Sequence, residues 1–379
     1  MKVVVAIDSL KGSLTSLEAG SAIREGVLRA DPEAEVIVRP LADGGEGTVE
    51  ALTIGMGGQL ERVLVTGPLG RPVECAYGIL PERGLGIVEM SGAAGITLVP
   101  ETELNPMNAT TYGVGEVIRD AIAKGCRHFL VGIGGSATND GGIGMLQALG
   151  FGLLNENGAP VSFGAKGLEE LRTITTDHVL PELRECTFRV ACDVTNPLCG
   201  ERGASAVYGP QKGASPADIL QMDKWLAAYA ELAKRYNSET NPEFPGAGAA
   251  GGLGFAFRTF LNAALDSGIK IVLEETHLAD YVRDADVVVT GEGKMDAQTC
   301  MGKAPVGVAN IAKQFGKPVV AFAGIVTPDA GAVNGSGIDA FFPILRTVVS
   351  RQEAMDGANA KRNMADTVEQ VFRALKLHI

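Results

Sequence analysis

The sequence predicts an α/β protein of two domains: a Rossmann-like, doubly wound, mostly parallel sheet with a second α/β domain inserted in it. Short runs of β-branched residues alternate with longer segments of helical period along most of the chain. Several of the short runs are apolar on both faces, which is typical of parallel strands covered by helices on each side. The 379 residues exceed the roughly 250–300 at which single cores stop growing, so more than one domain is expected.

The strands are predicted from the short apolar runs. The first run starts at Lys2 and is too short and too soon charged for a signal peptide, so a buried strand is expected there. The predicted strands are Lys2–Asp8, Ala34–Leu41, His128–Gly134, Phe188–Val194, Ala285–Thr290 and Lys317–Ala323.

The helices are predicted from the longer amphipathic segments. Ser16 and Ser215 are expected N-caps, and Pro216 follows Ser215 at the favoured first helical position. The predicted helices are Ser16–Ala30, Thr110–Lys124, Ser215–Tyr236, Gly252–Asp266, Lys303–Phe315 and Gln352–Leu377.

One β-rich region departs from this alternation and suggests the second domain. Gly58–Met90 carries turn sequences at Gly67–Gly70 and Pro81–Gly84, which is typical of an antiparallel meander. The domain boundaries follow from this region and from the middle third of the chain. We assign residues 1–58, 106–150 and 280–379 to the Rossmann-like domain, and residues 59–105 and 151–279 to the inserted domain.

The composition excludes several classes of function. With 33 Lys and Arg against 45 Asp and Glu, the formal net charge is −12, whereas nucleic-acid binding needs clustered basic residues. No run reaches the roughly 18 apolar residues of a membrane helix, so we expect no membrane partner and a cytoplasmic location. The six cysteines form no CxxC pair and the four histidines no HExxH motif, so a zinc site is not expected. The sequence makes no prediction of the oligomeric state.

Glycine accounts for 50 residues and gathers in four clusters. The clusters lie at 42–48, 132–142, 246–254 and 290–296. All but the one at 246–254 follow a predicted strand. Unhindered backbone amides beside a helix N-terminus bind anions, phosphate above all, and in doubly wound sheets such loops lie at the ligand-binding edge. The alternative for any single cluster is a tight turn without a ligand.

Charged residues accompany the glycines and favour phosphoryl transfer. The acids at or just after predicted strand ends are Asp43, Glu46, Asp140, Asp193, Glu292 and Asp296. A carboxylate beside phosphate-binding amides repels the ligand unless Mg²⁺ bridges the two. Lys11, Lys212 and Lys294 stand near the clusters as candidate cations for a phosphate or a substrate carboxylate. Hard oxygen ligands, glycine loops and a lysine are the parts that phosphoryl transfer needs. For each acid, the alternative is a helix or turn cap.

Two dinucleotide-like patterns keep other functions open. Gly132-x-Gly134-x-x-Ala137 follows a predicted strand, but the acid expected about 20 residues further on is missing. Gly246-x-Gly248-x-x-Gly251 follows a Pro-rich loop instead of a strand, and no GxxxxGK[ST] motif occurs. The alternatives are an NAD(P)-dependent oxidoreductase of a small hydroxy acid and a sugar-acid sensor that binds without turnover.

Taken together, these motifs resemble the bacterial glycerate kinase family of type 1 along essentially the whole chain. The matching stretches are Ile7–Ser13, 42–48, 134–142, 192–198, Gly209–Gly213, Ala249–Gly254 and Gly291–Lys303. The resemblance implies a kinase with ATP and Mg²⁺ as cofactors and D-glycerate as substrate. The members most similar to this sequence are associated with 2-phosphoglycerate as product, that is, with glycerate 2-kinase activity; a 3-phosphoglycerate-forming kinase is the alternative.

These considerations lead to a hypothesis for the site. Asp193 and Asp296 would hold Mg²⁺ or accept the proton of the attacking hydroxyl, without a ranking between them, and Lys11 would balance charge on the transferred phosphoryl group. The expected substrate-binding residues are Asp43, Glu46 and Lys294. The expected nucleotide- and phosphate-binding residues are Gly134, Gly135, Ser136, Asn139, Gly291, Glu292 and Gly293.

Overall fold

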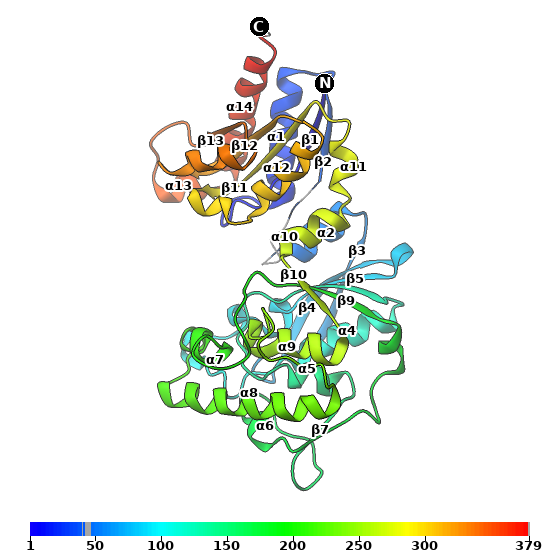
Figure 1. Cartoon of the computed structure of the whole chain (residues 1–379). Coiled ribbons are helices and arrows are strands. Elements are labelled where there is room, and N and C mark those ends of the chain that lie inside the picture. Colours follow the sequence, from blue (N-terminus) through cyan, green and yellow to red (C-terminus); the bar gives the residue numbers. More distant parts are fainter. Residues whose placement is uncertain (40, 42–46, 378–379) are drawn as a thin grey trace. The chain divides into compact units, whose positions relative to one another are not determined.

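The computed structural model describes residues 1–39, 41 and 47–377 and divides the chain into two compact units (Figure 1). The first unit consists of Met1–Asp43 and Ile269–Ile379, and the second is the continuous segment Gly44–Gly268. Two expected substrate-binding residues, Asp43 and Glu46, lie outside the described residues. None of the described helices combines the length and apolar character needed to cross a bilayer.

The first unit contains a five-stranded parallel sheet in the order β13-β12-β11-β1-β2. Its strands are β1 (Lys2–Val5), β2 (Glu35–Val38), β11 (Val287–Met295), β12 (Val319–Val326) and β13 (Ala340–Pro343). Numbered by their appearance within the unit, the strands run 2-1-3-4-5, a doubly wound order whose switch point lies between β1 and β11. The predicted mostly parallel α/β fold is confirmed.

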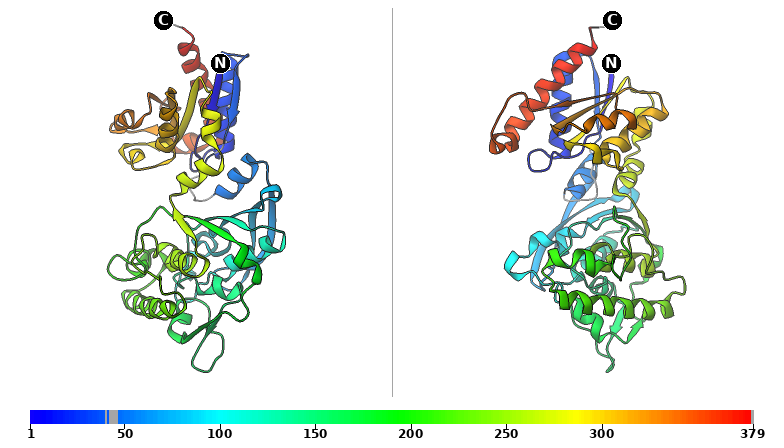
Figure 2. Two further views of the ribbon diagram at one scale, coloured as in Figure 1. Left: turned by 45° about the vertical axis from the view of Figure 1, so that its right-hand side comes forward. Right: turned by 60° about the vertical axis from the view of Figure 1, so that its left-hand side comes forward.

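Helices cover this sheet on both faces because its strands are apolar throughout. Val3, Val5, Val289 and Phe322 share one core cluster with residues of α1 and α14, which lie side by side in both views of Figure 2. The alternate side chains, such as Val4 and Val288, are equally buried, and α12 packs against β11 and β12. The helices are α1 (Ser16–Ala30), α10 (Gly268–Glu275), α11 (Leu278–Val282), α12 (Ala304–Gln314), α13 (Arg351–Met355) and α14 (Gly357–Leu375), with 3₁₀ turns η6 (Ala297–Cys300) and η7 (Ala330–Ser336).

The N-terminus of α1 shows why the predicted cap was one residue off. Thr15, not Ser16, caps the helix, in a capping box with Glu18. The hydroxyl of Ser16 instead donates to Ile7 O at 2.7 Å and accepts from Leu41 N at 2.9 Å, so it ties the ends of the first two strands together. The predicted cap of α8 is confirmed: Ser215 forms a capping box with Asp218, and Pro216 follows it.

The second unit contains a mixed six-stranded sheet in the order β10-β9-β6-β5-β4-β3. Its strands are β3 (Gln59–Thr66), β4 (Pro72–Leu80), β5 (Leu85–Glu89), β6 (His128–Gly132), β9 (Thr187–Ala191) and β10 (Ala264–Asp266); β7 (Gly152–Leu154) and β8 (Thr173–Thr175) form a separate pair. β3, β4 and β5 are antiparallel, which confirms the predicted meander, and β5, β6, β9 and β10 are parallel.

The helices of the second unit enclose its largest buried cluster, which includes Phe129, Tyr229 and Phe257. They are α2 (Thr48–Gly55), α3 (Ser91–Ala94), α4 (Tyr112–Ala123), α5 (Ile143–Ala148), α6 (Ala165–Glu170), α7 (Ala204–Tyr208), α8 (Pro216–Tyr236) and α9 (Ala249–Leu261). The 3₁₀ turns are η1 (Pro81–Arg83), η2 (Ile96–Leu98), η3 (Glu101–Glu103), η4 (Pro181–Glu185) and η5 (Pro210–Lys212).

The expected grouping of segments into domains differs from this division. Residues 106–150 were expected with the chain termini, yet β6 within them pairs with β5 and β9, and α4 packs on β3. The sheet of the second unit therefore takes up both the antiparallel meander and a βα segment. Strand alternation alone does not show to which of two sheets a parallel strand belongs.

Two predicted helices were too long. Gly252–Asp266 was expected to be one helix, but α9 ends at Leu261, where Asn262 adopts φ 51°, and β10 follows. Asn tolerates this left-handed conformation better than other residues with a side chain, which accounts for the stop. Gln352–Leu377 is divided at Asp356, whose side chain accepts from Asn359 N and caps α14.

Candidate functional site

The first group of candidate residues lies at the carboxyl ends of β1 and β11, next to the switch point of the first unit's sheet. Beyond the paired strands, Asp8 N donates to Gly291 O at 3.1 Å. Lys11 follows on the same loop, and a Cβ placed on Gly293 would lie 3.3 Å from the Lys11 amide nitrogen. The structure thus brings Lys11 and the 290–296 cluster together, where ligands bind in doubly wound sheets.

Gly291 and Gly293 lie within a strand, although a loop after Thr290 was predicted. β11 continues to Met295 and stays paired with β12 through Gly291, Glu292 and Lys294. A Cβ on Gly291 would lie 1.9 Å from Phe322 O, so the close approach of β12 requires glycine there. Sheet pairing accounts for this glycine without a ligand, and the role of Gly291 and Gly293 in holding phosphate stays a prediction.

Glu292 is a buried acid with partners on the neighbouring turn. Its carboxylate accepts from Thr299 Oγ1 at 2.5 Å and lies 3.4 Å from Lys303 Nζ. Burial raises the pKa of Glu292, while the bonds from Thr299 and Lys303 oppose that rise. These contacts hold the Glu292 side chain against the residues that follow β11.

Asp296 begins that turn and lies between two lysines. Its Oδ2 is 3.0 Å from Lys294 Nζ and its Oδ1 is 3.8 Å from Lys303 Nζ. The hydrogen bond from Lys294 is the main cause that lowers the pKa of Asp296. The carboxylate also accepts from Gln298 N at 3.0 Å as the N-cap of η6. Both the capping alternative and the ionic surroundings are therefore present at this residue.

Lys303 is the residue of this group to which the sequence analysis gave no role. It contacts both Glu292 and Asp296, and its side chain remains 40% exposed. The available signal was its place at the end of the 291–303 motif. A lysine that contacts two acids and still reaches solvent can interact with an anionic ligand.

The second group lies along one edge of the second unit's sheet. Because β5, β6, β9 and β10 are parallel, the residues after each strand meet at the same edge. Gly134 and Gly135 follow β6 and are exposed, and Ser136 is 8% exposed. Asp193 follows β9, is exposed, and accepts from Gly268 N at 3.0 Å. The structure thus brings Asp193 and Gly134–Ser136 to one edge.

Strand β5 supplies a further acid at this edge that the sequence analysis did not assign. Glu89 ends β5 and accepts from Val49 N, near the start of α2, at 2.7 Å. Ser91 follows it, and its Cβ would lie 3.7 Å from a Cβ placed on Gly135. The sequence places Glu89 at the end of the β-rich region 58–90. Because this region was predicted to be an antiparallel meander, its last strand was not considered as part of the site.

Asn139 and Asp140 turn into the interior. Asp140 is wholly buried and accepts from Thr111 N, Thr111 Oγ1, Gly142 N and Gly144 N at 2.8–3.3 Å. Asn139 is also wholly buried, and its Nδ2 donates to Ser205 Oγ at 2.8 Å. These contacts match the capping alternative for Asp140. A direct contact between the Asn139 side chain and nucleotide stays a prediction that these contacts do not favour.

Two further expectations for anion binding fit the structure poorly. The cluster at 246–254 packs on the 138–141 segment: Gly141 N donates to Gly251 O at 2.9 Å, and a Cβ on Gly251 would lie 2.1 Å from Thr138 O. Its glycines therefore serve close packing. Lys212 is only 1% exposed and its ammonium is bonded internally, so it does not reach a ligand directly.

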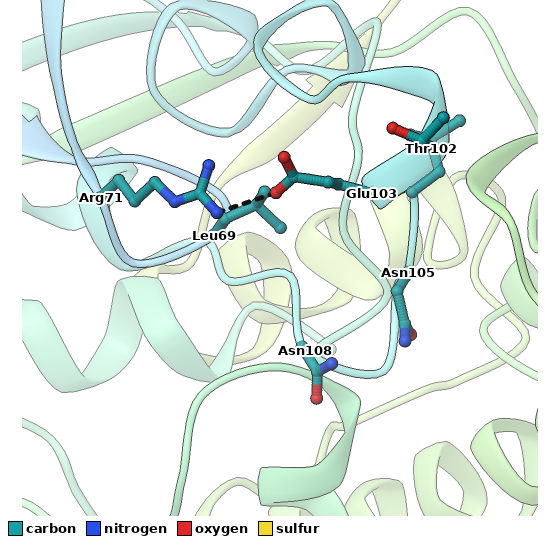
Figure 3. Close-up of a pocket in the computed structure, with 7 residues that line it drawn as sticks. Leu69, Arg71, Thr102, Glu103, Asn105 and Asn108 are labelled. Atoms are coloured by element: carbon teal, nitrogen blue, oxygen red, sulfur yellow. Dashed lines mark hydrogen bonds and ion pairs between the residues drawn. The ribbon is translucent and has the colours of Figure 1, made fainter.

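A pocket of about 390 Å³ lies elsewhere in the second unit (Figure 3). Arg71 Nη2 and Glu103 Oε2 form an ion pair of 2.9 Å in it. None of the predicted site residues that the structure describes lines this pocket, whose lining residues are Leu69, Arg71, Thr102, Glu103, Leu104, Asn105 and Asn108. Leu69 and Leu104 also pack with Ala137 of the 132–142 cluster, so the pocket adjoins that segment.

The described residues contain no group of three or more His, Cys, Asp or Glu that could hold a metal ion. Mg²⁺ is usually held by one or two carboxylates together with water and substrate phosphates. Asp193 or Asp296 can each supply one such carboxylate. This mode of binding does not require a complete set of protein ligands.

Comparison with known proteins places the whole chain. Residues 3–376 match the glycerate kinase family. The chain is 46% identical over 375 residues to a protein of Haemophilus influenzae named glycerate kinase, covering 99% of each. It is 45% identical over 373 residues to the glycerate 2-kinase of Escherichia coli, covering 97% of this chain and 98% of that one.

A solved structure agrees with these relatives. A crystal structure from Salmonella typhimurium LT2 is 44% identical and superposes with a TM-score of 0.92, covering 100% of this chain and 98% of that one. The predicted α/β fold and the predicted family are both confirmed by these similarities. The chain belongs to the glycerate kinase family.

Proposed function

We propose that this chain is an ATP-dependent kinase that phosphorylates D-glycerate on its 2-hydroxyl, giving 2-phosphoglycerate and ADP. The observation that carries the proposal is the nearly full-length likeness, at 45% identity, to a protein named glycerate 2-kinase. The oxidoreductase alternative is set aside, because the matched family is one of kinases. A cytoplasmic location stays a prediction from the sequence.

We assign the anionic parts of the reaction to the lysines of the first unit. Lys294 and Lys303 lie beside Asp296, with side chains 59% and 40% exposed, so both reach solvent near the switch point of the sheet. Lys11 stands on the adjoining loop. These ammonium groups would bind the substrate carboxylate and the charge on the transferred phosphoryl group.

In the second unit, we assign phosphate binding to the exposed backbone of Gly134 and Gly135 and to the hydroxyl of Ser136. Ala137 N is already bonded to Ala94 O at 3.0 Å, so the amides available for phosphate end before it. Asp43 and Glu46 keep their proposed role as ligands of the glycerate hydroxyls or the metal. In phosphoryl transfer, positioning and electrostatics of such residues supply most of the rate enhancement.

Magnesium fits the acids of this chain. Asp296 has a lowered pKa and so stays ionised at neutral pH, as a metal ligand must. We propose Asp296 as a ligand, with Asp193 the second candidate; when bound, the ion neutralises charge on the phosphate oxygens. The same lowered pKa makes Asp296 a weak base. With Asp296 on the metal, Asp193 is the candidate to accept the proton of the attacking hydroxyl.

The direct test measures ADP release with D-glycerate as the sole acceptor, followed by phosphorus NMR of the product. We expect ADP in proportion to glycerate consumed and one product phosphorylated at the 2-hydroxyl. A 3-phosphoglycerate signal would replace only the regiochemistry. Absence of ADP with D-glycerate and its close homologues would refute the proposed kinase, and ligand-dependent stabilisation without ADP would favour the sensor.

A further inference from the structure

Lys212 is a buried lysine with a specific set of contacts. It ends η5, and the whole residue is 1% exposed. Its Nζ donates to Ser136 Oγ at 2.7 Å and to Thr138 O at 2.6 Å. The turn at 209–213 is thereby tied to the segment that follows β6 and carries the proposed phosphate-binding amides.

The chemistry of this contact fixes the direction of the hydrogen bonds. The protonated ammonium of Lys212 has three donors and no acceptor, so in this form Ser136 Oγ accepts from Lys212. The hydroxyl hydrogen of Ser136 must then point to a different acceptor. Ser136 is 8% exposed and directly follows the exposed Gly134 and Gly135. Lys212 thus occupies one acceptor site of Ser136 Oγ and leaves the hydroxyl hydrogen to donate at the place where backbone amides are open to solvent.

Stability alone does not account for this lysine. Burial lowers the pKa of Lys212 to about 7, although the charge of Asp140 opposes that shift. Burial in turn raises the pKa of Asp140, and four hydrogen bonds from Thr111, Gly142 and Gly144 oppose that rise. A whole buried pair of charges can often be replaced by apolar side chains without loss of stability, so burial of such charges is weak evidence for a purely structural role. Perturbed titratable groups gather at functional sites, which is consistent with a role beyond packing.

We propose that Lys212 is a positioning residue of the kinase: it holds Ser136 so that the serine hydroxyl donates a hydrogen bond to a phosphate oxygen of ATP bound at Gly134–Ser136. The inference deepens the proposed function and rests on it. Lys212 itself does not touch the nucleotide. Ser136 is the residue that makes the contact, and the bond from Lys212 directs the hydroxyl hydrogen of Ser136 away from Lys212.

The test compares Ser136→Ala, Ser136→Thr, Lys212→Met and the double variant Lys212→Met with Ser136→Ala in the full chain. ATP binding is measured by calorimetry, and KM for ATP and kcat are measured at saturating D-glycerate. We expect Ser136→Ala and Lys212→Met each to raise Kd and KM for ATP by roughly tenfold or more, the range for a hydrogen bond to a charged group. Ser136→Thr keeps the hydroxyl and should stay within about threefold of wild type.

The double variant separates positioning from an independent structural effect. If Lys212 acts through Ser136, the double variant binds ATP no more weakly than either single one. Multiplicative losses, or a Ser136→Ala variant with wild-type ATP affinity, would overturn the inference. Lys234→Met is the matched control, since Lys234 is an exposed lysine of the same unit paired with Glu231, and its ATP affinity should not change.

Two further outcomes are also decisive. If Lys212→Met does not fold by circular dichroism, Ser136→Ala against Ser136→Thr still decides whether the hydroxyl contacts ATP. A wild-type chain that releases ADP with D-glycerate while Ser136→Ala is unchanged overturns this inference alone. A wild-type chain that binds ATP in a Ser136-dependent way but never phosphorylates glycerate refutes the proposed function and supports this contact.

Discussion

The Asp296 carboxylate has a structural role as an N-cap and a proposed chemical role as a ligand of Mg²⁺. It caps η6 through Gln298 N and lies between Lys294 and Lys303. We expect Asp296→Asn to lower kcat by about 100-fold or more, because removing one preorganised electrostatic partner of phosphoryl transfer costs that much, while the amide can still cap the turn. Steady-state kinetics and a thermal melt of the same sample check both parts.

Asp286, which directly precedes β11, offers the control for Asp296→Asn. Asp286 accepts from Lys2 N at 2.7 Å just before β11 begins, at the opposite edge of the sheet from Asp296. Asp286→Asn should therefore keep kcat near the wild-type value. Asp193→Asn should behave as Asp296→Asn does. Near-normal activity in both Asp193→Asn and Asp296→Asn would contradict the proposed roles of the two acids.

Lys212 predicts a pH dependence of stability. Its pKa is about 7 when folded against 10.5 for the ordinary group, so between these values the unfolded chain binds more protons at this site. The contribution of Lys212 to the free energy of unfolding is therefore least favourable below pH 7 and becomes more favourable as the pH rises toward 10.5. Denaturant unfolding at pH 6.5 and pH 9 should show wild type gaining stability relative to Lys212→Met.

The control for this measurement is an exposed lysine. Lys234→Met removes a lysine that is exposed beside Glu231, so the effect of burial on Lys212 is read from the difference between the two variants. Asp140 is the charged group that acts on Lys212; burial raises the pKa of Asp140, and bonds from Thr111 and Gly142 oppose that rise. A difference between wild type and Lys212→Met that does not change with pH would contradict the lowered pKa.

At the scale of elements, the glycine-rich start of α9 supports the segment after β6. Gly251 has φ 67°, and a Cβ there would lie 2.1 Å from Thr138 O. Gly251→Ala should lower the free energy of unfolding by roughly 2–4 kcal/mol, from backbone strain and overpacking together. Gly331→Ala is the control, since nothing lies within 4 Å of its Cβ position. Equal denaturation midpoints for the two variants would contradict this account.

Helices and strands whose bounds depend on neighbouring residues in the sequence were predictable. Those whose bounds depend on pairing with distant strands were not. α1 was predicted from Ser16 to Ala30, where it lies, because its apolar face and its caps depend on residues close together in the sequence. β11 was ended five residues early at Thr290, because Gly-Glu-Gly is typical of a turn until a neighbouring strand pairs with it. β10 was taken for the end of α9, since only its pairing with β9 makes Ala264–Asp266 a strand.

The candidate site divides in the same way. Lys11, Glu292 and Asp296 were named from their positions at predicted strand ends, and the structure places all three beside the switch point. The inward turn of Asn139 could not be predicted, because its partner Ser205 lies far along the chain. The burial of Lys212 was likewise hidden, since a lysine after Pro210 in a glycine turn is typical of an exposed loop.

At the scale of the whole molecule, the two compact units have separate cores. The largest buried cluster takes its residues from Val65 to Ala263, all within the second unit. The cluster under α1 and α14 takes its residues from the two segments of the first unit. Each unit thus has the apolar core that independent folding requires. The second unit has the advantage of a continuous chain.

We therefore expect the fragment 44–268 to fold without the rest of the chain. It keeps the sheet, the buried Asp140 and Lys212 contacts, and the Gly134–Ser136 amides, so its near-ultraviolet dichroism and cooperative denaturant transition should be those of a packed domain. It lacks Lys11, Glu292, Lys294 and Asp296, so it should release no ADP with D-glycerate. A non-cooperative transition would show that its core depends on the first unit. ADP release by the fragment would show that the lysines and acids of the first unit are not needed for the reaction.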